Sequence, residues 1–212
     1  MTTTKKKTYV YIDGFNLYYG AVKDTKYKWL DLQKLSENIL PNDYEIAHVR
    51  YFTAPIIRRP KSSAPERQMV YINALKKHTP SITVHLGKFT EHSFEGKIVK
   101  PQSSKEYETV TKATEKHSDV NLAAHLINDA WRDSYDCALL ISNDSDFKEA
   151  LLLAKKECSK EIAVANPSGQ YPSHVLQQHA DLKTSVTKGA LEKSQLPINI
   201  PGTNISKPPD WN

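Results

Sequence analysis

The sequence predicts an α/β fold with a mainly parallel central sheet, and three observations support this class. Two apolar stretches, residues 8–12 and 137–141, each end in an aspartate-containing turn that is followed by a helical pattern. Strand and helix patterns alternate from residue 8 to residue 86, an order that implies parallel strands joined by right-handed crossovers. Residues 87–116 then contain alternating, β-branched runs, which predict an antiparallel hairpin projecting from the sheet.

The stretch from residue 137 to residue 147 joins a buried strand to a helix. Its apolar run ends in a polar turn with two carboxylates, Asp144 and Asp146, and helical spacing begins at Phe147. Ser145 alone would satisfy a plain helix start, because Ser and Asp are ordinary caps. A second carboxylate is more than a cap needs, and clustered carboxylates repel each other unless a proton or metal ion lies between them. The pattern therefore favours a metal site.

The stretch at residues 8–12 repeats this arrangement near the N-terminus. It is nearly all apolar or aromatic, as expected for a central strand covered on both faces, and it ends at Asp13. Gly14 then permits a tight turn. If the two strands are neighbours, Asp13 lies beside Asp144 and Asp146, at the edge where open α/β sheets bind ligands.

The other elements follow from apolar spacing and from helix-breaking residues. We expect helices at residues 17–22, 32–40, 65–78, 120–131 and 173–180, and further strands at 45–53, 82–86 and 161–165. The hairpin at 87–116 is either a simple edge extension or a wall of a substrate groove. Residues 1–7 form a basic N-terminal extension and 8–186 the folded domain. The tail, 187–212, has four of the twelve prolines, a composition typical of extended or disordered chain.

The helix expected at residues 120–131 is preceded by an acidic residue, Asp119. Asp119 lies in the first turn, where the helix dipole should keep its carboxylate ionised. Asp129 and His125 lie on other faces of the same helix, so we expect both at the surface.

Four acids therefore fall at strand ends or helix starts on one predicted edge of the sheet: Asp13, Asp119, Asp144 and Asp146. Carboxylate oxygens of this kind suit Mg²⁺ or Mn²⁺. We expect Asp13, Asp144 and Asp146 to bind the metal, and Asp119 to complete the cluster or align the attacking water. Such a metal stabilises charge on an attacked phosphate.

Four further residues are candidates for supporting roles. Asn16 and Ser142 could orient a carboxylate or a water, and Lys116 and Arg50 are candidate phosphate contacts, although an ordinary solvated cation is the simpler interpretation of each. The sequence has no visible Ser/His or Cys/His nucleophile arrangement and no glycine-rich phosphate loop.

Composition excludes several classes of protein. With 212 residues, one domain is the default. No apolar run approaches the roughly 20 residues of a membrane span, and no apolar stretch behind the N-terminus predicts a signal peptide. Cys137 and Cys158 form no CxxC pair, which is typical of a reduced cytoplasmic protein. The eight histidines lack zinc-site spacing.

The distribution of charge indicates the kind of partner. The net charge is +5, and residues 50–78 contain seven Lys or Arg but one acid, Glu66. A basic body around an acidic cluster suits a polyanionic substrate that is cut with help from a cation.

Three motifs together resemble the NYN domain, the LabA-like branch of the PIN-like nucleases. They are Val-Tyr-Ile-Asp-Gly-Phe-Asn-Leu at 10–17, Glu-Lys-His-Ser-Asp-Val-Asn-Leu-Ala at 115–123 and Ser-Asn-Asp-Ser-Asp-Phe at 142–147. Residues 50–54, 84–89 and two segments of the tail are also similar to bacterial members. The resemblance thus covers essentially the whole chain, tail included, so the tail is expected to pack along the body.

The resemblance implies a Rossmann-like three-layer α/β/α sandwich whose acids gather around Mg²⁺ or Mn²⁺, and cleavage of RNA phosphodiester bonds. The family's acids fall on the four aspartates named above, and its motif Asn falls on Asn16. His117 departs from the pattern, because Gly is common there. The alternative is a non-catalytic module that binds RNA or a protein; a phosphatase fits less well, since Asp13-Gly14-Phe15 lacks a second Asp. The sequence leaves DNA as a substrate and a homodimer open.

Overall fold

The computed structural model describes residues 4–98, 107–167 and 171–211. The strands are β1 (Lys6–Asp13), β2 (Tyr44–Thr53), β3 (Ile82–Leu86), β4 (Lys88–Lys97), β5 (Tyr107–Lys116), β6 (Cys137–Ile141), β7 (Glu161–Asn166) and β8 (Leu182–Ser185). The α-helices are α1 (Gly14–Leu17), α2 (Leu32–Ile39), α3 (Ala64–His78), α4 (Ser118–Trp131), α5 (Lys148–Lys156), α6 (His174–His179) and α7 (Lys188–Lys193). A π-helix, η1 (Tyr18–Val22), and two 3₁₀ helices, η2 (Ser145–Phe147) and η3 (Pro209–Trp211), complete the elements.

The central sheet confirms the predicted fold class. Its six strands are ordered β3-β2-β1-β6-β7-β8, and every neighbouring pair is parallel. The chain builds outward from β1 to β3 and then returns to β6 beside β1. This reversal of strand order is the position at which open α/β sheets form a ligand-binding crevice.

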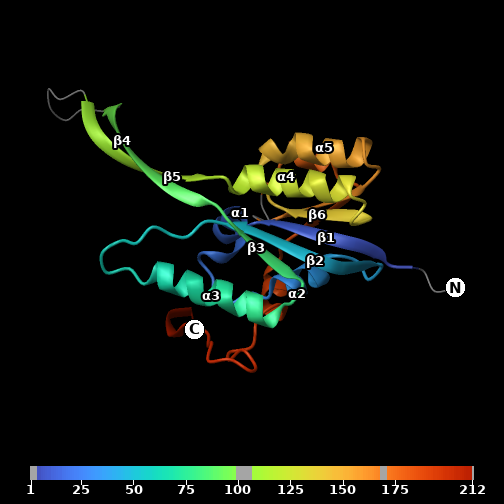
Figure 1. The fold of residues 1–212 in the computed structure, drawn as a ribbon, viewed down its shortest axis with the longest axis horizontal. Coiled ribbons are helices and arrows are strands. Elements are labelled where there is room, and N and C mark those ends of the chain that lie inside the picture. Colours follow the sequence, from blue (N-terminus) through green and yellow to red (C-terminus); the bar gives the residue numbers. More distant parts are fainter. Residues whose placement is uncertain (1–3, 99–106, 168–170, 212) are drawn as a thin grey trace.

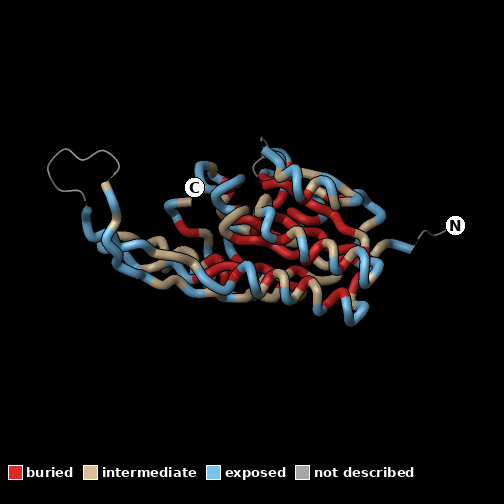
Figure 2. The backbone as a smooth tube through the Cα atoms, turned by 90° about the horizontal axis from the view of Figure 1, so that it is seen from above, coloured by how far each residue is buried: buried red, intermediate tan, exposed pale blue. Residues whose placement is uncertain are grey.

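Helices cover both faces of the sheet, as expected for three layers (Figure 1). Successive side chains of a strand point to opposite faces, so Val10 and Ile12 pack in one core with Leu75 of α3. Tyr11 packs in the other core with Leu122 of α4. Figure 2 shows the buried residues concentrated along the sheet. Parallel strands covered on both faces explain the nearly continuous apolar runs in the sequence.

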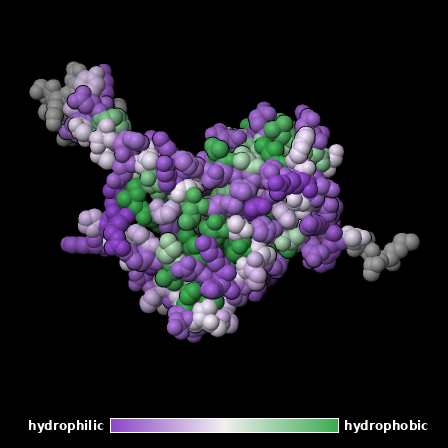
Figure 3. Space-filling model, in the orientation of Figure 1, coloured by the Kyte–Doolittle hydropathy of each residue, from purple (hydrophilic) through white to green (hydrophobic). Residues whose placement is uncertain are grey.

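The predicted hairpin is present. β4 and β5 pair antiparallel over ten residues each, from Lys88 opposite Lys116 outward to Lys97 opposite Tyr107. The hairpin projects from the same end of the sheet as α1 (Figure 1). The surface in Figure 3 is mostly hydrophilic, with hydrophobic side chains gathered near the middle of the face shown.

The C-terminal tail packs on the body, so the expectation of disorder from its composition is wrong and the expectation from the resemblance is confirmed. Leu196 and Ile200 are buried in the core on the α2 and α3 side. The indole N–H of Trp29 donates to the carbonyl of Pro197 at 2.8 Å, and the ring of Trp211 lies 6.1 Å from that of Trp29. These contacts provide the apolar burial that the proline count does not reveal.

The helix expected at residues 17–22 begins earlier and changes type. Asp13 caps α1, which starts at Gly14, and the chain continues as the π-helix η1, whose Lys23 N–H donates to the carbonyl of Tyr18. Within the described ranges, no helix combines the length and the apolar character needed to cross a membrane.

Candidate active site

Ser142 joins the ends of the two central strands. Its hydroxyl donates to Oδ2 of Asp13 at 3.1 Å, and its oxygen accepts the backbone N–H of Asp144 at 3.1 Å. Asp13 is buried at the end of β1, and Ser142 is fully buried just after β6. Because β1 and β6 are neighbours, the two predicted acidic turns meet as expected.

Asn16 ties the same two turns together a second time. Its side-chain oxygen accepts the backbone N–H of Asn143, and its own backbone N–H donates to Oδ1 of Asp13, each at 3.0 Å. Gly14 in turn lets this segment pack closely on β2, since a Cβ there would lie 2.6 Å from the carbonyl oxygen of Phe52. Asn16 therefore positions the turns.

Asp144 takes the capping role that Ser145 could have filled. One oxygen of Asp144 accepts the backbone N–H of Asp146 at 3.0 Å, at the start of η2. Asp146 is exposed and Asp144 is half-buried. A carboxylate can cap a helix through one oxygen and still have acceptor capacity for a ligand.

Asp119 is exposed at the start of α4. The turn that precedes it, at His117, is strained. His117 has a left-handed backbone with φ of 86°, which explains why Gly is common at this position in the family the sequence resembles. Glu115 accepts hydrogen bonds from the backbone N–H and the hydroxyl of Ser118, at 3.3 and 2.7 Å. A Cβ on Gly87 would lie 2.6 Å from the carbonyl oxygen of Lys116, so this glycine lets the turn pack.

The electrostatics show that the acids form one group. Burial first, and then the negative charges of Asp13, Glu115, Asp144 and Asp146, raise the pKa of Asp119 to about 6. Burial also raises the pKa of Asp13, with a contribution from Asp144. Partial burial and the four neighbouring negative charges therefore act against the helix dipole, which favours the ionised form of Asp119.

Glu115 is the member of the group that sequence reasoning missed. The sequence does contain an indication of this role. Glu115 lies three residues before Ser118, the first residue of the helix, which is the spacing of a local capping interaction. Its contribution to the cluster is a repulsion of Asp119, four residues further along the chain, which it approaches through its hydrogen bonds to Ser118.

Arg50 is engaged inside the protein. Its guanidinium binds Asp129 through two hydrogen bonds, Nε to Oδ2 at 2.6 Å and Nη2 to Oδ1 at 3.0 Å. The Tyr11 hydroxyl donates to the same carboxylate at 2.8 Å. Asp129 is 3 % exposed, so the prediction of a surface position is wrong for it. The Arg50 guanidinium is engaged by Asp129, whereas Lys116 is exposed at the end of β5, and a phosphate contact by either residue stays a prediction.

Comparison with known proteins identifies the family. Residues 7–186 match the NYN domain. The chain belongs to the NYN domain family. This domain is one of the PIN-like nuclease families, so the resemblance noted in the three motifs is confirmed.

Two similar proteins extend the comparison. The NYN chain is 33% identical, over 97% of its length and 75% of the relative's, to 6-hydroxy-3-succinoylpyridine 3-monooxygenase HspA of Pseudomonas putida. A crystal structure of a protein of unknown function from Vibrio parahaemolyticus matches with a TM-score of 0.57 and 17% identity, over 92% of this chain and 99% of that one. The second likeness shows the fold.

The donor set of the NYN site fits a hard cation in its chemistry. Burial is the largest cause of the raised pKa of Asp119, and the repulsion between carboxylates that adds to it is a condition that a divalent cation relieves. Across residues 4–98, 107–167 and 171–211, no three His, Cys, Asp or Glu side chains are already arranged to ligate a single ion. Asp119 and Asp146 are exposed, in the first turn of α4 and in η2 respectively.

Proposed function

We propose that this NYN protein is a metal-dependent endoribonuclease. The observation that carries the proposal is the electrostatic grouping of Asp13, Asp119, Asp144 and Asp146 at the carboxyl edge of the sheet, where the strand order reverses. Membership of a PIN-like nuclease family supports the same reaction class. The net charge of +5 favours a polyanionic substrate despite the local acidity of the site.

Asp13, Asp144 and Asp146 would hold Mg²⁺ or Mn²⁺ through carboxylate oxygens, the ligands that hard cations prefer. When bound, the ion would supply Lewis-acid stabilisation of negative charge on the attacked phosphate.

The chain's own residues would position this chemistry. The hydroxyl of Ser142 holds the Asp13 carboxylate, and the amide of Asn16 holds the turn that carries Asp144. Asp119 would align the attacking water from the opposite wall, at the start of α4. Lys116, exposed beside that wall, would contact a phosphate of the strand.

The test is cleavage of a labelled single-stranded RNA, and of a DNA of the same sequence, with Mg²⁺, Mn²⁺ or EDTA. We expect RNA cutting that requires the metal and that falls at least a hundredfold in Asp144→Asn, as expected for loss of one metal ligand. The matched control is Asp43→Asn, an exposed aspartate before β2 at the opposite end of the sheet. Equal residual cutting by Asp144→Asn would identify a contaminating nuclease.

A non-catalytic binding module makes a different prediction. RNA binding would then survive both EDTA and Asp144→Asn, with no cutting under any metal condition. A gel-shift series beside the cleavage assay separates the two, because the nuclease requires turnover.

A second candidate function is oxygenation of a small aromatic ring. The observation that favours it is the 33% identity to a protein named as a hydroxypyridine monooxygenase, over nearly the whole chain. The test is incubation with 6-hydroxy-3-succinoylpyridine, dioxygen and an added reductant, with oxygen uptake and product mass as readouts. Ring oxygenation without RNA cleavage would replace the nuclease proposal.

A further inference from the structure

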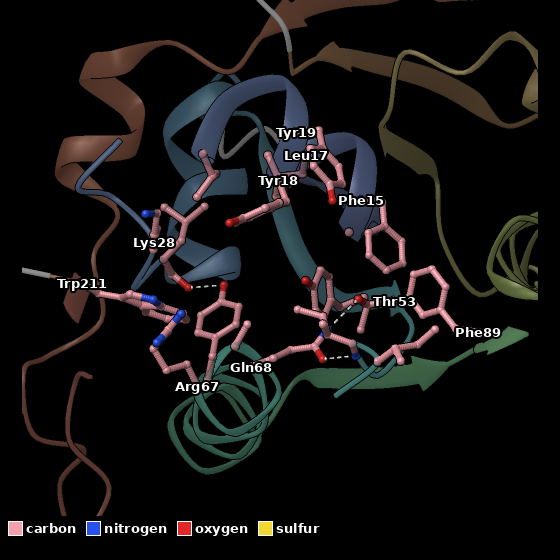
Figure 4. A pocket seen from close by; sticks show the side chains of 18 of the residues that line it. Phe15, Leu17, Tyr18, Tyr19, Lys28, Thr53, Arg67, Gln68, Phe89 and Trp211 are labelled. Carbon is pink, nitrogen blue, oxygen red and sulfur yellow. Dashed lines mark hydrogen bonds between the residues drawn. The ribbon is translucent and has the colours of Figure 1, made fainter. Parts of the chain in front are cut away.

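A pocket lined by aromatic side chains lies next to the acidic edge. Its volume is about 320 Å³, at the lower end of the range for ligand sites in proteins. Its aromatic lining comes from five separate parts of the chain, and includes Phe15, Tyr18, Tyr51, Tyr71, Phe89 and Trp211. In Figure 4, Trp211 and Phe89 lie on opposite sides of the pocket and the side chain of Tyr18 points into it.

The pocket and the acidic cluster share two walls. Gly14 and Phe15 follow Asp13 directly, and both line the pocket. The ring of Phe15 packs edge-on against that of Phe89, with centroids 5.5 Å apart. Phe89 lies opposite Glu115 in the hairpin, so the second wall also leads from the pocket to an acid of the cluster. The pocket therefore begins at residues that adjoin two acids of the cluster, Asp13 along the chain and Glu115 across the hairpin.

Two polar groups of the pocket, those of Gln68 and Tyr71, are engaged with the backbone. The Gln68 amide donates to the carbonyl of Ala54 and accepts the N–H of Ile56, each at 2.9 Å. The hydroxyl of Tyr71 donates to the carbonyl of Leu30 at 2.8 Å. A ring in this pocket would be held by stacking and apolar contact, with little hydrogen-bond discrimination.

Cationic side chains stand at the mouth. Arg59 pairs with Glu91 at 2.7 Å and Arg67 with Asp210 at 2.8 Å, while their side chains remain 58% and 27% exposed. Both arginines line the pocket, as does Lys28. Exposed guanidinium groups can share their donors with a phosphate. This combination of an aromatic interior and a cationic mouth favours a nucleotide within a strand over an uncharged free ring.

We propose that the pocket holds one base of an RNA strand, taken from a nucleotide near the phosphate at the acidic edge, with little preference among the bases. The identity of the strand rests on the proposed function. The placement of the base rests on the pocket itself. The base site and the nuclease function can therefore be rejected independently of each other.

The test is an abasic scan. Five-nucleotide RNAs, each lacking the base at one position, are titrated against the full-length protein in EDTA, where metal-dependent cutting cannot occur. Binding is followed by fluorescence anisotropy of a terminal dye. We expect one position at which loss of the base weakens binding about tenfold, as for one stacked base, and similar affinities when that base is changed among A, C, G and U.

Two pocket variants identify where the base binds. In Tyr18→Ala and in Trp211→Ala, the affinity should no longer depend on which position of the RNA lacks its base. Tyr18 is 38% exposed, so its removal leaves a folded protein even if loss of Trp211 loosens the tail. The matched control is Trp131→Ala, a 73% exposed tryptophan on α4 that is not among the lining residues, and it should keep the tenfold loss.

A flat scan with the unmodified protein, or an unchanged scan in Tyr18→Ala, overturns the proposal. Binding of 2-hydroxypyridine that depends on Tyr18 and Trp211 and is not displaced by RNA also overturns it, in favour of a free ring. A tenfold loss of affinity at one abasic position, without RNA cleavage, supports the base site and rejects the nuclease. RNA cleavage, with equal affinities at all abasic positions, supports the nuclease and rejects the base site.

Discussion

The hydroxyl of Ser142 donates to Oδ2 of Asp13 across the boundary between β6 and β1, over 3.1 Å. The same oxygen accepts the N–H of Asp144, so one buried side chain links two of the proposed metal ligands. These bonds hold the two acidic turns at a set separation before any ligand binds. Their contribution can be measured.

Ser142→Ala should destabilise the protein by about 1 to 3 kcal/mol, because it leaves a buried carboxylate oxygen and a backbone N–H without this partner. Urea denaturation measures the loss. Ser145→Ala, at an exposed serine three residues away, is the control and should change stability by less than about 0.5 kcal/mol. Equal stabilities of the two variants would contradict the linking role of Ser142.

Asp119→Asn should change how stability depends on pH. The folded-state pKa of Asp119 is about 6, above the 3.8 of an unperturbed aspartate. Between these values the folded protein binds more protons than the unfolded one, so this group's contribution to stability falls as pH rises. Without metal, Asp119→Asn should therefore melt higher than the unmodified protein above pH 6, with a smaller difference near pH 4. Added Mg²⁺ should narrow the difference.

Melting curves at pH 4, 5, 6 and 7 provide this comparison. Asp43→Asn, the exposed aspartate at the opposite end of the sheet, is the control and should follow the unmodified protein. A pH-independent difference would mean that Asp119 does not experience the charges of the cluster. Solvent exposure of Asp119 limits the size of the effect but not its sign.

Asp129→Ala should destabilise the protein by about 3 to 5 kcal/mol, since it leaves the nearly buried Arg50 charge unpaired. Arg50→Ala should also be destabilising, and the double variant should lose much less than the sum of the two. A double-mutant cycle in guanidinium chloride measures this coupling. Additive losses would contradict the ion pair. The cycle thus tests the contribution of the Arg50–Asp129 pair to stability.

His117→Gly should be neutral or stabilise the protein by up to about 1 kcal/mol. A side chain in the left-handed region costs roughly 1 to 2 kcal/mol, and glycine removes that cost while adding freedom to the unfolded chain. Lys112→Gly, at an exposed position of β5, is the control and should lose roughly 0.5 to 1 kcal/mol. Thermal denaturation measures the stability of both variants. A large loss of stability in His117→Gly would assign a packing role to the imidazole.

Much of the fold and the site could be predicted from the sequence because the signals are local. Apolar runs identified β1 and β6, and the polar turns that follow them identified Asp13, Asp144 and Asp146. The first-turn position of Asp119 followed from the spacing of α4. The apolar run of a buried strand and the periodicity of a helix each span only a few residues, so the local sequence indicates these elements.

The tertiary structure alone decided the features that depend on contacts between distant segments. Asp129 looked like a surface residue from its helix position, but Arg50 and Tyr11 on neighbouring strands bury and pair it. Glu115 acts on Asp119 because its carboxylate turns back to accept hydrogen bonds from Ser118 at the start of α4. The aromatic pocket required Tyr18, Tyr71, Phe89 and Trp211 to meet from four parts of the chain. The sequence by itself determined which chemical groups the chain carries and on which elements, whereas packing determined their neighbours, and neighbours set burial and pKa.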